Sequence, residues 1–349
     1  MSHPHAPSTM KAITQHRYGG LDTLEYATVA RPVAAKDEVL IRVQAASVNA
    51  ADWLLTQGEP FVARLAFGLR RPRVTTRGRD VAGVIEAVGD DVRRFGVGDE
   101  VYAEVDAGSF AEYTVAHEKR LAHKPSRIGF GEAAAVPIAA TTALQGVRDV
   151  AKIEPGDKVL VNGASGGVGS FAVQLAKAFG AQVTGVCSTA NLEFVRSLGA
   201  DHVIDYTVED FATGEARYDV IFDLAGNRSL AECRRALTRR GTLVLASGNG
   251  DRVFGPIRRM LAAMLLGPFV TQNLRPLAAV ANGADLEVLR ALIDAGTLTP
   301  PVDRSYPLAE TPEAIRSFVE EPVKGKITIA VTRQNTTEAQ IERTPPPRL

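Results

Sequence analysis

One glycine-rich stretch constrains the fold of this chain more than any other part of its sequence. Residues 159–169 read Val-Leu-Val-Asn-Gly-Ala-Ser-Gly-Gly-Val-Gly, and the helix-forming residues 170–179 follow directly. An apolar strand, a glycine turn and a helix N-terminus in this order gather backbone N–H groups and the positive end of a helix dipole at one point, which suits a pyrophosphate. Gly163 and Gly166 allow a tight turn, and Gly169 lets the helix approach the sheet. The stretch therefore predicts a dinucleotide-binding turn, with contacts from Ser165, Gly166, Gly167 and Val168.

An ordinary loop is the alternative interpretation, because isolated glycine patterns are common. The flanking residues favour the dinucleotide turn, since Gly180 ends the helix and residues 182–186 form a second apolar strand, which completes a βαβ unit. Further buried strands are expected at 202–204, 220–223 and 242–246, with helices at 192–198 and 230–237. This alternation predicts one doubly wound parallel sheet.

The first third of the chain has a different pattern. Over residues 11–122, short strands alternate with turn residues, which is typical of a barrel-like β domain. Residues 131–150 are alanine-rich and helical, and the alternation of strands and helices begins after them. A length of 349 residues favours two domains, with a boundary near Pro137. After Pro301 the pattern is again that of β-strands.

Composition points to a small-molecule partner. Forty basic and forty acidic residues give no net charge, so no overall field attracts nucleic acid or an anionic membrane. Residues 1–9 are polar and have no apolar core, so neither a secretory signal nor a membrane anchor is expected there. The two cysteines, Cys187 and Cys233, make no CxxC motif, which fits a reducing cytoplasm and excludes a cysteine-based zinc site.

An ordered set of motifs runs through nearly the whole chain. It comprises residues 47–52, 78–89, 98–101, 110–113, 135–137 and 142–143, the glycine turn, residues 199–206, and Gly325-Lys326. With these motifs the chain resembles the medium-chain dehydrogenase/reductase superfamily, and within it the zinc-free quinone oxidoreductase-like branch. The resemblance implies a Rossmann domain inserted in a GroES-like, mainly β catalytic domain, NAD(P)H-dependent reduction, and a homodimer.

The resemblance also divides the chain into segments. The expected order is a disordered tail (1–9), the first part of the GroES-like catalytic domain (10–137), the Rossmann dinucleotide-binding domain (138–275), a return to the catalytic domain (276–334) and a second disordered tail (335–349). The second tail is polar and contains three consecutive prolines, which is typical of disorder.

The chain departs from the zinc-dependent members of that superfamily. Those enzymes carry an early Cys ligand and a Gly-His-Glu stretch, where this chain has Asn49 and Gly78-Arg79-Asp80. A guanidinium has no lone pair for a metal and an amide is a poor zinc ligand, so no metal site is predicted. Without a metal as Lewis acid, an alcohol substrate is not activated for oxidation in the usual way. Reduction of a quinone or an activated C=C mainly requires that the acceptor is positioned against the nicotinamide. An alcohol dehydrogenase-like enzyme remains an alternative.

Asn49 is the predicted catalytic residue, a polar group that lines the cleft and orients the acceptor or the carboxamide by hydrogen bonding. Alternatively, it is only a turn residue at the end of a strand. Asp52 is expected to be structural, because it lies beside a turn. Related reductases often have a tyrosine two positions after that aspartate, where this chain has Leu54. No side-chain proton donor is therefore predicted, and water is expected to protonate the product.

NADPH is the expected cofactor, with NADH as the alternative. An Asp or Glu about 20 residues past the glycines would bind an NAD ribose, but the residues around Ser188 contain no carboxylate, which removes a repulsion of the 2′-phosphate. By resemblance, Tyr206 borders that phosphate, Thr142 contacts a phosphate or the ribose, and Ser247 holds the nicotinamide carboxamide. The lysine that several relatives use is Asn191 here; Arg196 is a candidate substitute, or simply a solvated residue.

Two further segments have alternative interpretations. Residues 251–270 contain an apolar stretch too short to span a bilayer, which caps the substrate pocket or packs against another subunit. Residues 61–79 carry six arginines with Phe61 and Phe67 between them. A nucleic-acid surface is one interpretation of that segment. The favoured one is a flap over the substrate, whose cations would favour an anionic acceptor.

The sequence thus predicts a cytoplasmic, zinc-independent, NADPH-dependent reductase of a quinone or an α,β-unsaturated carbonyl. The rival hypothesis is a cofactor-binding sensor or structural protein without turnover, since the usual acid is absent at Leu54.

Overall fold

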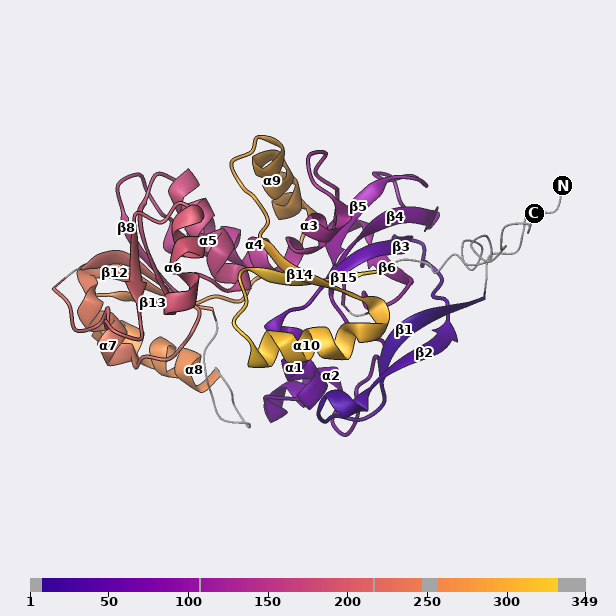
Figure 1. Ribbon diagram of the computed structural model, residues 1–349, viewed down its shortest axis with the longest axis horizontal. Coiled ribbons are helices and arrows are strands. Elements are labelled where there is room, and N and C mark those ends of the chain that lie inside the picture. The colour runs from indigo at the N-terminus through magenta and orange to yellow at the C-terminus, as the bar shows by residue number, and fades with distance from the viewer. Residues whose placement is uncertain (1–7, 107, 216, 247–256, 332–349) are drawn as a thin grey trace, which may run out of the picture.

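The structure is a computed structural model that describes residues 8–106, 108–215, 217–246 and 257–331. The molecule is elongated, with an α/β unit at one end and a mainly β unit at the other (Figure 1). Residues 1–7 and 335–349 of the predicted disordered tails and Ser247 lie outside the described residues, whereas Thr9, predicted to belong to the first tail, begins the first β-strand.

A six-stranded parallel sheet forms the centre of the α/β unit. Its strands are β8 (Lys158–Asn162), β9 (Gln182–Cys187), β10 (His202–Asp205), β11 (Tyr218–Asp223), β12 (Leu237–Leu245) and β13 (Asn273–Pro276). The connecting helices are α4 (Pro137–Gln145), α5 (Gly167–Ala178), α6 (Leu192–Ser197), α7 (Leu230–Ala236) and α8 (Ile257–Leu266). The strand order β10-β9-β8-β11-β12-β13 is that of a doubly wound Rossmann sheet, and it reverses between β8 and β11. The predicted fold class of this unit is confirmed.

The mainly β unit is built from both ends of the chain. A seven-stranded sheet contains β3 (Glu38–Ser47), β4 (Asp80–Val88), β5 (Glu100–Glu104), β6 (Tyr113–His117), β7 (Leu121–His123), β14 (Val302–Pro307) and β15 (Lys326–Ala330). A separate hairpin pairs β1 (Thr9–Gln15) with β2 (Leu24–Ala30). β15 lies antiparallel to β3, with Thr328 opposite Ser47. The α/β unit is therefore an insertion in the β unit, as the resemblance implied, while the exact boundaries at 137 and 275 stay predictions.

Helices also belong to the β unit. They are α1 (Ala50–Gln57), α2 (Arg64–Phe67), α3 (Phe130–Ala134), α9 (Gly283–Asp294) and α10 (Thr311–Glu320). Single turns of 3-10 helix lie at 21–23, 61–63, 118–120, 189–191, 267–269 and 308–310, and a π-helical turn at 146–151 extends α4. α1 begins because Asn49 and Asp52 form a capping box at its N-terminus. The prediction of an all-β pattern over residues 11–122 was wrong at α1 and α2.

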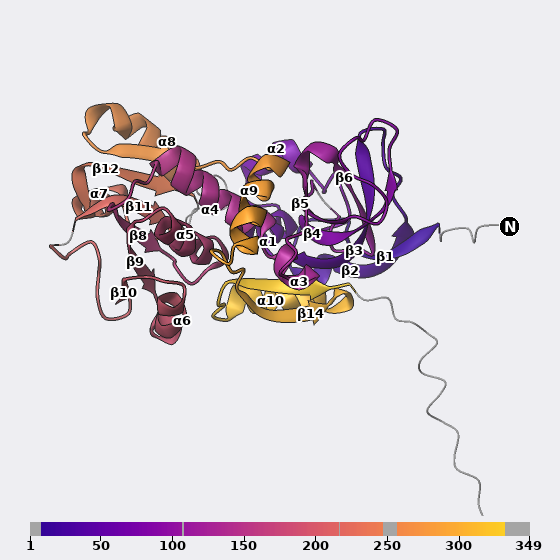
Figure 2. The same ribbon diagram turned by 90° about the horizontal axis from the view of Figure 1, so that it is seen from above.

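One hydrophobic core joins the two units. The cluster around the parallel sheet includes Phe171 and Phe222, and it continues to Ala45 of β3 and Tyr102 of β5. The Tyr102 hydroxyl donates to the carbonyl of Leu286 in α9 at 2.6 Å. Seen from above, α4 and α9 lie between the two units (Figure 2). The two walls of the site described next are therefore attached to the same buried core.

Candidate active site

The glycine turn lies between β8 and α5, where the sequence predicted it. Gly163 has a φ of +91°, a conformation that favours glycine. A Cβ on Gly169 would lie 2.0 Å from the carbonyl oxygen of Gly163, so α5 can take this position only with glycine there. Gly166 is the N-cap of α5 and Gly167 its first residue. The first amides of the helix have no intrahelical acceptor, so the turn can bind an anion.

Two hollows meet at this turn. The inner hollow, of about 370 Å³, lies between the glycine turn and the residues Asn49, Thr142 and Lys326. The outer hollow, of about 260 Å³, lies at the carboxyl ends of β8, β9 and β11 and is lined by Ser188 and Tyr206, among others. Gly163 and Ser165 line both hollows. Together they follow the edge at which doubly wound sheets bind dinucleotides.

The structure brings together every predicted site residue that it describes. The inner hollow is lined by Asn49, Thr142, Ser165, Gly166, Gly167 and Val168, and the outer hollow by Ser165, Ser188 and Tyr206. Ser247 lies outside the described residues. Thr142 lies in the sixth position of α4, where its hydroxyl donates to the carbonyl of Ile138 at 2.7 Å.

No carboxylate lines the outer hollow among the described residues. Asn191, where relatives have a lysine, is buried and donates from Nδ2 to the Ser165 hydroxyl at 3.1 Å. Arg196, the candidate substitute for that lysine, instead forms an ion pair with Glu193 on α6 and does not line the hollow. Of the two alternatives for Arg196, this geometry favours a solvated residue over a substitute for the lysine.

Lys326 lines the inner hollow but was not among the predicted site residues. Its side chain is 3% exposed, and Nζ donates to Asn49 Oδ1 at 2.5 Å and to the carbonyl of Val48 at 2.9 Å. Asp80 Oδ2 lies 3.5 Å from the same nitrogen. Burial lowers the pKa of Lys326, and the carboxylates of Asp80 and Asp52 oppose that shift. Gly325-Lys326 was recognised only as a family motif, and nothing local indicates that it lies against Asn49.

The buried Asp80 carboxylate completes this cluster and connects it to the α/β unit. Asp80 accepts hydrogen bonds from the Ser47 hydroxyl and from Asn49 Nδ2, both at 2.9 Å, and from the backbone N–H of Ile138 in α4 at 3.0 Å. We call Asn49, Asp80 and Lys326 the polar bracket. A Cβ on Gly167 would lie 2.9 Å from Lys326 Cδ, so the bracket packs directly against the glycine turn.

The polar bracket fixes the orientation of the Asn49 amide. Its oxygen faces the Lys326 ammonium, and its nitrogen faces the Asp80 carboxylate. The opposite orientation would place a donor against the ammonium and an acceptor against the carboxylate. Both ends of the amide are therefore engaged within the protein, at the wall of the inner hollow. That Asn49 orients the acceptor stays a prediction.

Asp52 has the structural role that the sequence indicated. Its carboxylate accepts from the backbone N–H of Asn49 at 2.8 Å and so caps α1. The side chain is buried, and burial raises its pKa to about 7, although the hydrogen bond from Asn49 opposes the shift.

Comparisons with known proteins were consistent over most of the chain. Residues 35–126 match the family described as "Alcohol dehydrogenase GroES-like domain", and residues 198–329 match "Zinc-binding dehydrogenase". The "Chloroplast envelope quinone oxidoreductase homolog" of Arabidopsis thaliana is 32% identical over 93% of this chain and 99% of its own length. The chain belongs to the medium-chain dehydrogenase/reductase superfamily, in its quinone oxidoreductase-like branch.

Other members of this branch are similar over the same region. The "NADPH-dependent alkenal/one oxidoreductase, chloroplastic" of Arabidopsis thaliana is 36% identical over 93% of this chain and 80% of its own length. The structure of the quinone oxidoreductase from Coxiella burnetii superimposes with a TM-score of 0.82 at 29% identity, covering 93% of this chain and all of that one. The similarity therefore includes both units of this medium-chain reductase.

Among the described residues of this quinone oxidoreductase-like chain, none of the helices could span a lipid bilayer, and no three or more His, Cys, Asp or Glu side chains are grouped so that they could hold a metal ion. α8, from the predicted apolar segment, packs against β13, and its Arg259 forms an ion pair with the buried Asp223. Whether α8 caps the substrate or contacts another subunit stays a prediction.

We expect Asp52→Asn to reduce the pH dependence of stability. Because the pKa of Asp52 is raised, the folded chain holds a proton on this carboxyl that the unfolded chain releases. The resulting contribution of Asp52 to the free energy of unfolding is full below about pH 4 and is lost as the pH rises to about 7. Asparagine keeps an acceptor for the Asn49 N–H but does not titrate. Between about pH 5 and about pH 8 the free energy of unfolding, from urea denaturation, should fall by at least about 1 kcal/mol more in the wild type than in the variant. An equal fall of the free energy of unfolding in both proteins would contradict the raised pKa of Asp52.

Proposed function

We propose that this chain is an NADPH-dependent reductase that transfers hydride to a quinone or to the activated C=C of an enone or enal. The observation that carries the proposal is the inner hollow, which is lined by the glycine turn and by Asn49 and Lys326 of the adjacent polar bracket. Relatives named for quinone and alkenal/one reduction, 32% and 36% identical, support the same chemistry.

The residues present fit a dinucleotide cofactor. The free amides at the start of α5 would bind its pyrophosphate, and the positive φ of Gly163 keeps the turn open to it. When bound, the nicotinamide would supply the hydride. The chain itself supplies position: Lys326 and Asp80 hold Asn49 at the wall, and the apolar side chains of Leu224 and Phe318 limit water in the hollow. Solvent would supply the proton that completes reduction of a C=C.

We also propose that the reaction needs no zinc. In the described structure, the oxygen atoms of Asn49 and Asp80 are engaged by the Lys326 ammonium and by N–H and O–H donors. Arg79, which occupies the position of a ligand in zinc-dependent relatives, pairs with Glu104 at 2.6 Å. A guanidinium offers a metal no lone pair.

A panel of acceptors tests the proposed function. Purified protein, treated with a chelator and then dialysed, is mixed with NADPH or NADH and a series of quinones and enones, and loss of reduced nicotinamide is followed by absorbance. We expect NADPH oxidation with at least one class of acceptor and no effect of added zinc. Cofactor binding without turnover of any acceptor would favour the sensor hypothesis. Turnover of ethanol only after zinc is added would favour an alcohol dehydrogenase.

If the chain prefers NADPH, Ser188→Asp should weaken the use of that cofactor. The new carboxylate would lie in the outer hollow, where the 2′-phosphate is proposed to bind, and like charges repel. We expect the KM for NADPH to rise about tenfold, equivalent to about 1.4 kcal/mol, with little change for NADH. Ser197→Asp, which adds the same charge at an exposed position at the end of α6, is the matched control. Equal effects of both substitutions would contradict the placement of the phosphate.

Homodimer formation and a cytoplasmic location are further proposals. β13 forms one edge of the parallel sheet in the described structure, and Leu261, Met264 and Leu265 of α8, which packs on it, are exposed and apolar. Light scattering on the purified protein tests the dimer. The two free, buried cysteines fit a reducing compartment, although the relatives compared above include chloroplastic ones. Cell fractionation tests the location.

A further inference from the structure

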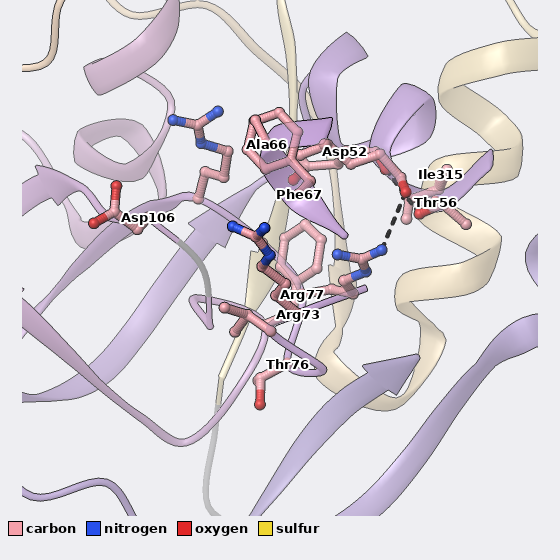
Figure 3. A pocket seen from close by; sticks show the side chains of 14 residues that line it. Asp52, Thr56, Ala66, Phe67, Arg73, Thr76, Arg77, Asp106 and Ile315 are labelled. Carbon is pink, nitrogen blue, oxygen red and sulfur yellow. Dashed lines mark hydrogen bonds between the residues drawn. The ribbon is translucent and has the colours of Figure 1, made fainter. Parts of the chain in front are cut away.

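A separate cavity lies beside α1, in the β unit, and no predicted cofactor residue lines it. It has a volume of about 240 Å³ and is lined by α1, by part of the segment 61–79, and by Phe110 and Ile315. Arg73, Arg77 and Arg79 all line it, and we call it the arginine cavity. Figure 3 shows Arg73 and Arg77 near its centre, with Phe67 on one side and Asp106 on another.

The arginine cavity has more positive than negative charge. Segment 61–79 contains six arginines and no acidic residue. Two carboxylates line the cavity, and both are engaged: Asp52 caps α1, and Asp106 accepts from Arg120 at 2.6 Å. Three guanidinium groups thus face two carboxylates that already have partners.

The three arginines differ in how many partners their guanidinium groups have. Arg77 donates to Gln15 Oε1 at 2.7 Å and to the Leu55 carbonyl, which holds it in place. Arg79 pairs with Glu104, but its buried Nε has no hydrogen-bond partner in the described chain. Arg73 is exposed and forms no ion pair with any described residue. Planar guanidinium groups with free donors suit a carboxylate.

The rest of the lining is largely apolar. Leu55, Phe67, Val74 and Phe110 contribute to it, and Phe67 and Val74 are also exposed to solvent. A volume of about 240 Å³ is below the roughly 300–1,000 Å³ of a site that encloses a whole drug-sized ligand. The cavity therefore suits one end of a longer molecule with an apolar stem.

The arginine cavity and the inner hollow are neighbours along two helices. On α1, the capping residue Asn49 lines the hollow, while Asp52 and Thr56 line the cavity. At a rise of 1.5 Å per residue, these positions are about 5–10 Å apart along the helix axis. On α10, Phe318 lines the hollow, and Ile315, one turn earlier, lines the cavity. One extended molecule of modest length can contact both.

We propose that the arginine cavity binds the carboxylate end of the acceptor, so that the preferred acceptors are amphipathic enals or enones with a terminal carboxylate. This inference rests on the proposed function. It adds a specificity determinant, Arg73, outside the residues that hold the cofactor.

A matched pair of acceptors tests the proposal. (E)-8-Oxooct-6-enoic acid and its methyl ester have the same reducible group and differ in charge. With NADPH, we expect kcat/KM of the wild type to be about tenfold higher for the acid than for the ester. Arg73→Gln should reduce this ratio to about two, mainly through the KM for the acid. Arg71→Gln, an exposed residue of the same segment that does not line the cavity, should leave the ratio unchanged.

The ester separates failure of the inference from failure of the proposed function. Reduction of both compounds at equal kcat/KM would overturn the inference and leave the reductase intact. An equal loss of acid preference in the two variants would also overturn it, because general surface charge would then explain the preference. If neither compound oxidises NADPH and the wider panel is also inactive, the proposed function fails and the inference with it.

Binding without turnover gives an independent measurement. Octanoate has the carboxylate and the apolar stem but no reducible bond. Calorimetric titration should detect octanoate binding to the wild type and to Arg71→Gln, and at least about fivefold weaker binding to Arg73→Gln. Equal affinity in all three proteins would overturn the assignment of Arg73. Thermal midpoints that agree among the three proteins would confirm that each is folded.

Discussion

Gly169→Val should eliminate measurable cofactor binding and destabilise the protein by about 3 kcal/mol or more. Even the Cβ of the new side chain would lie 2.0 Å from the Gly163 carbonyl oxygen and 2.9 Å from Ala164 Cα. Those contacts are with backbone, which cannot rotate away as the end of a flexible side chain can. α5 must therefore move off the sheet, and the amides at its N-terminus move with it. Urea denaturation measures the loss of stability, and calorimetry with NADPH measures the loss of binding.

A second glycine provides the control for this substitution. Gly131 lies in α3, and a Cβ there would meet nothing within 4 Å. Gly131→Ala should leave cofactor affinity unchanged and either leave stability unchanged or raise it by up to about 1 kcal/mol, because alanine favours a helix. Full cofactor affinity in Gly169→Val would contradict the assignment of the turn as the pyrophosphate site.

The glycine turn was predictable because its signal is local. Strand, glycines and helix follow one another within residues 159–179, and the positive φ of Gly163 and the close approach at Gly169 are what such a sequence requires. The parallel sheet followed from the same alternation. Where the signal was local but overlooked, as in the capping box of Asn49 and Asp52, the helix α1 was missed, although its spacing could have indicated a helix start.

The polar bracket was not predictable from local pattern. Lys326 and Asn49 are 277 residues apart in the chain, and only the pairing of β15 with β3 brings them together. A lysine at the start of a strand is ordinarily a solvated residue, so its burial depends on tertiary structure. The family motif located Lys326 but gave it no role.

The basic segment 61–79 was only partly predictable from the sequence. Its six arginines indicated a cationic surface near the substrate, but sequence alone could not show which of them face a cavity. The structure places Arg73, Arg77 and Arg79 there, because the segment passes α1 before entering β4. These three residues are spaced by four and then by two positions, which fits no single helix or strand period, so a periodic pattern would not have selected them together.

Lys326→Met is expected to cost about 3–5 kcal/mol of stability, because removing one partner of a buried ion pair leaves the other uncompensated. The variant keeps much of the apolar stem but loses the donor to Asn49 Oδ1 and to the Val48 carbonyl, so the Asp80 carboxylate stays buried without its cation. We expect urea denaturation to show the loss, and calorimetry to show weaker NADPH binding, because Lys326 packs against Gly167 of the turn.

A surface lysine and a double variant distinguish this effect from a general loss of charge. Lys177 pairs with Asp201 at 2.8 Å, but both side chains are more than one-third exposed to solvent, so Lys177→Met should cost no more than about 1 kcal/mol. Adding Asp80→Asn to Lys326→Met removes the unpaired buried charge and should recover part of the lost stability, but not the cofactor affinity, since Asn49 still lacks its partner. If Lys326→Met and Lys177→Met were equally mild, the polar bracket would not be what holds Asn49 beside the glycine turn.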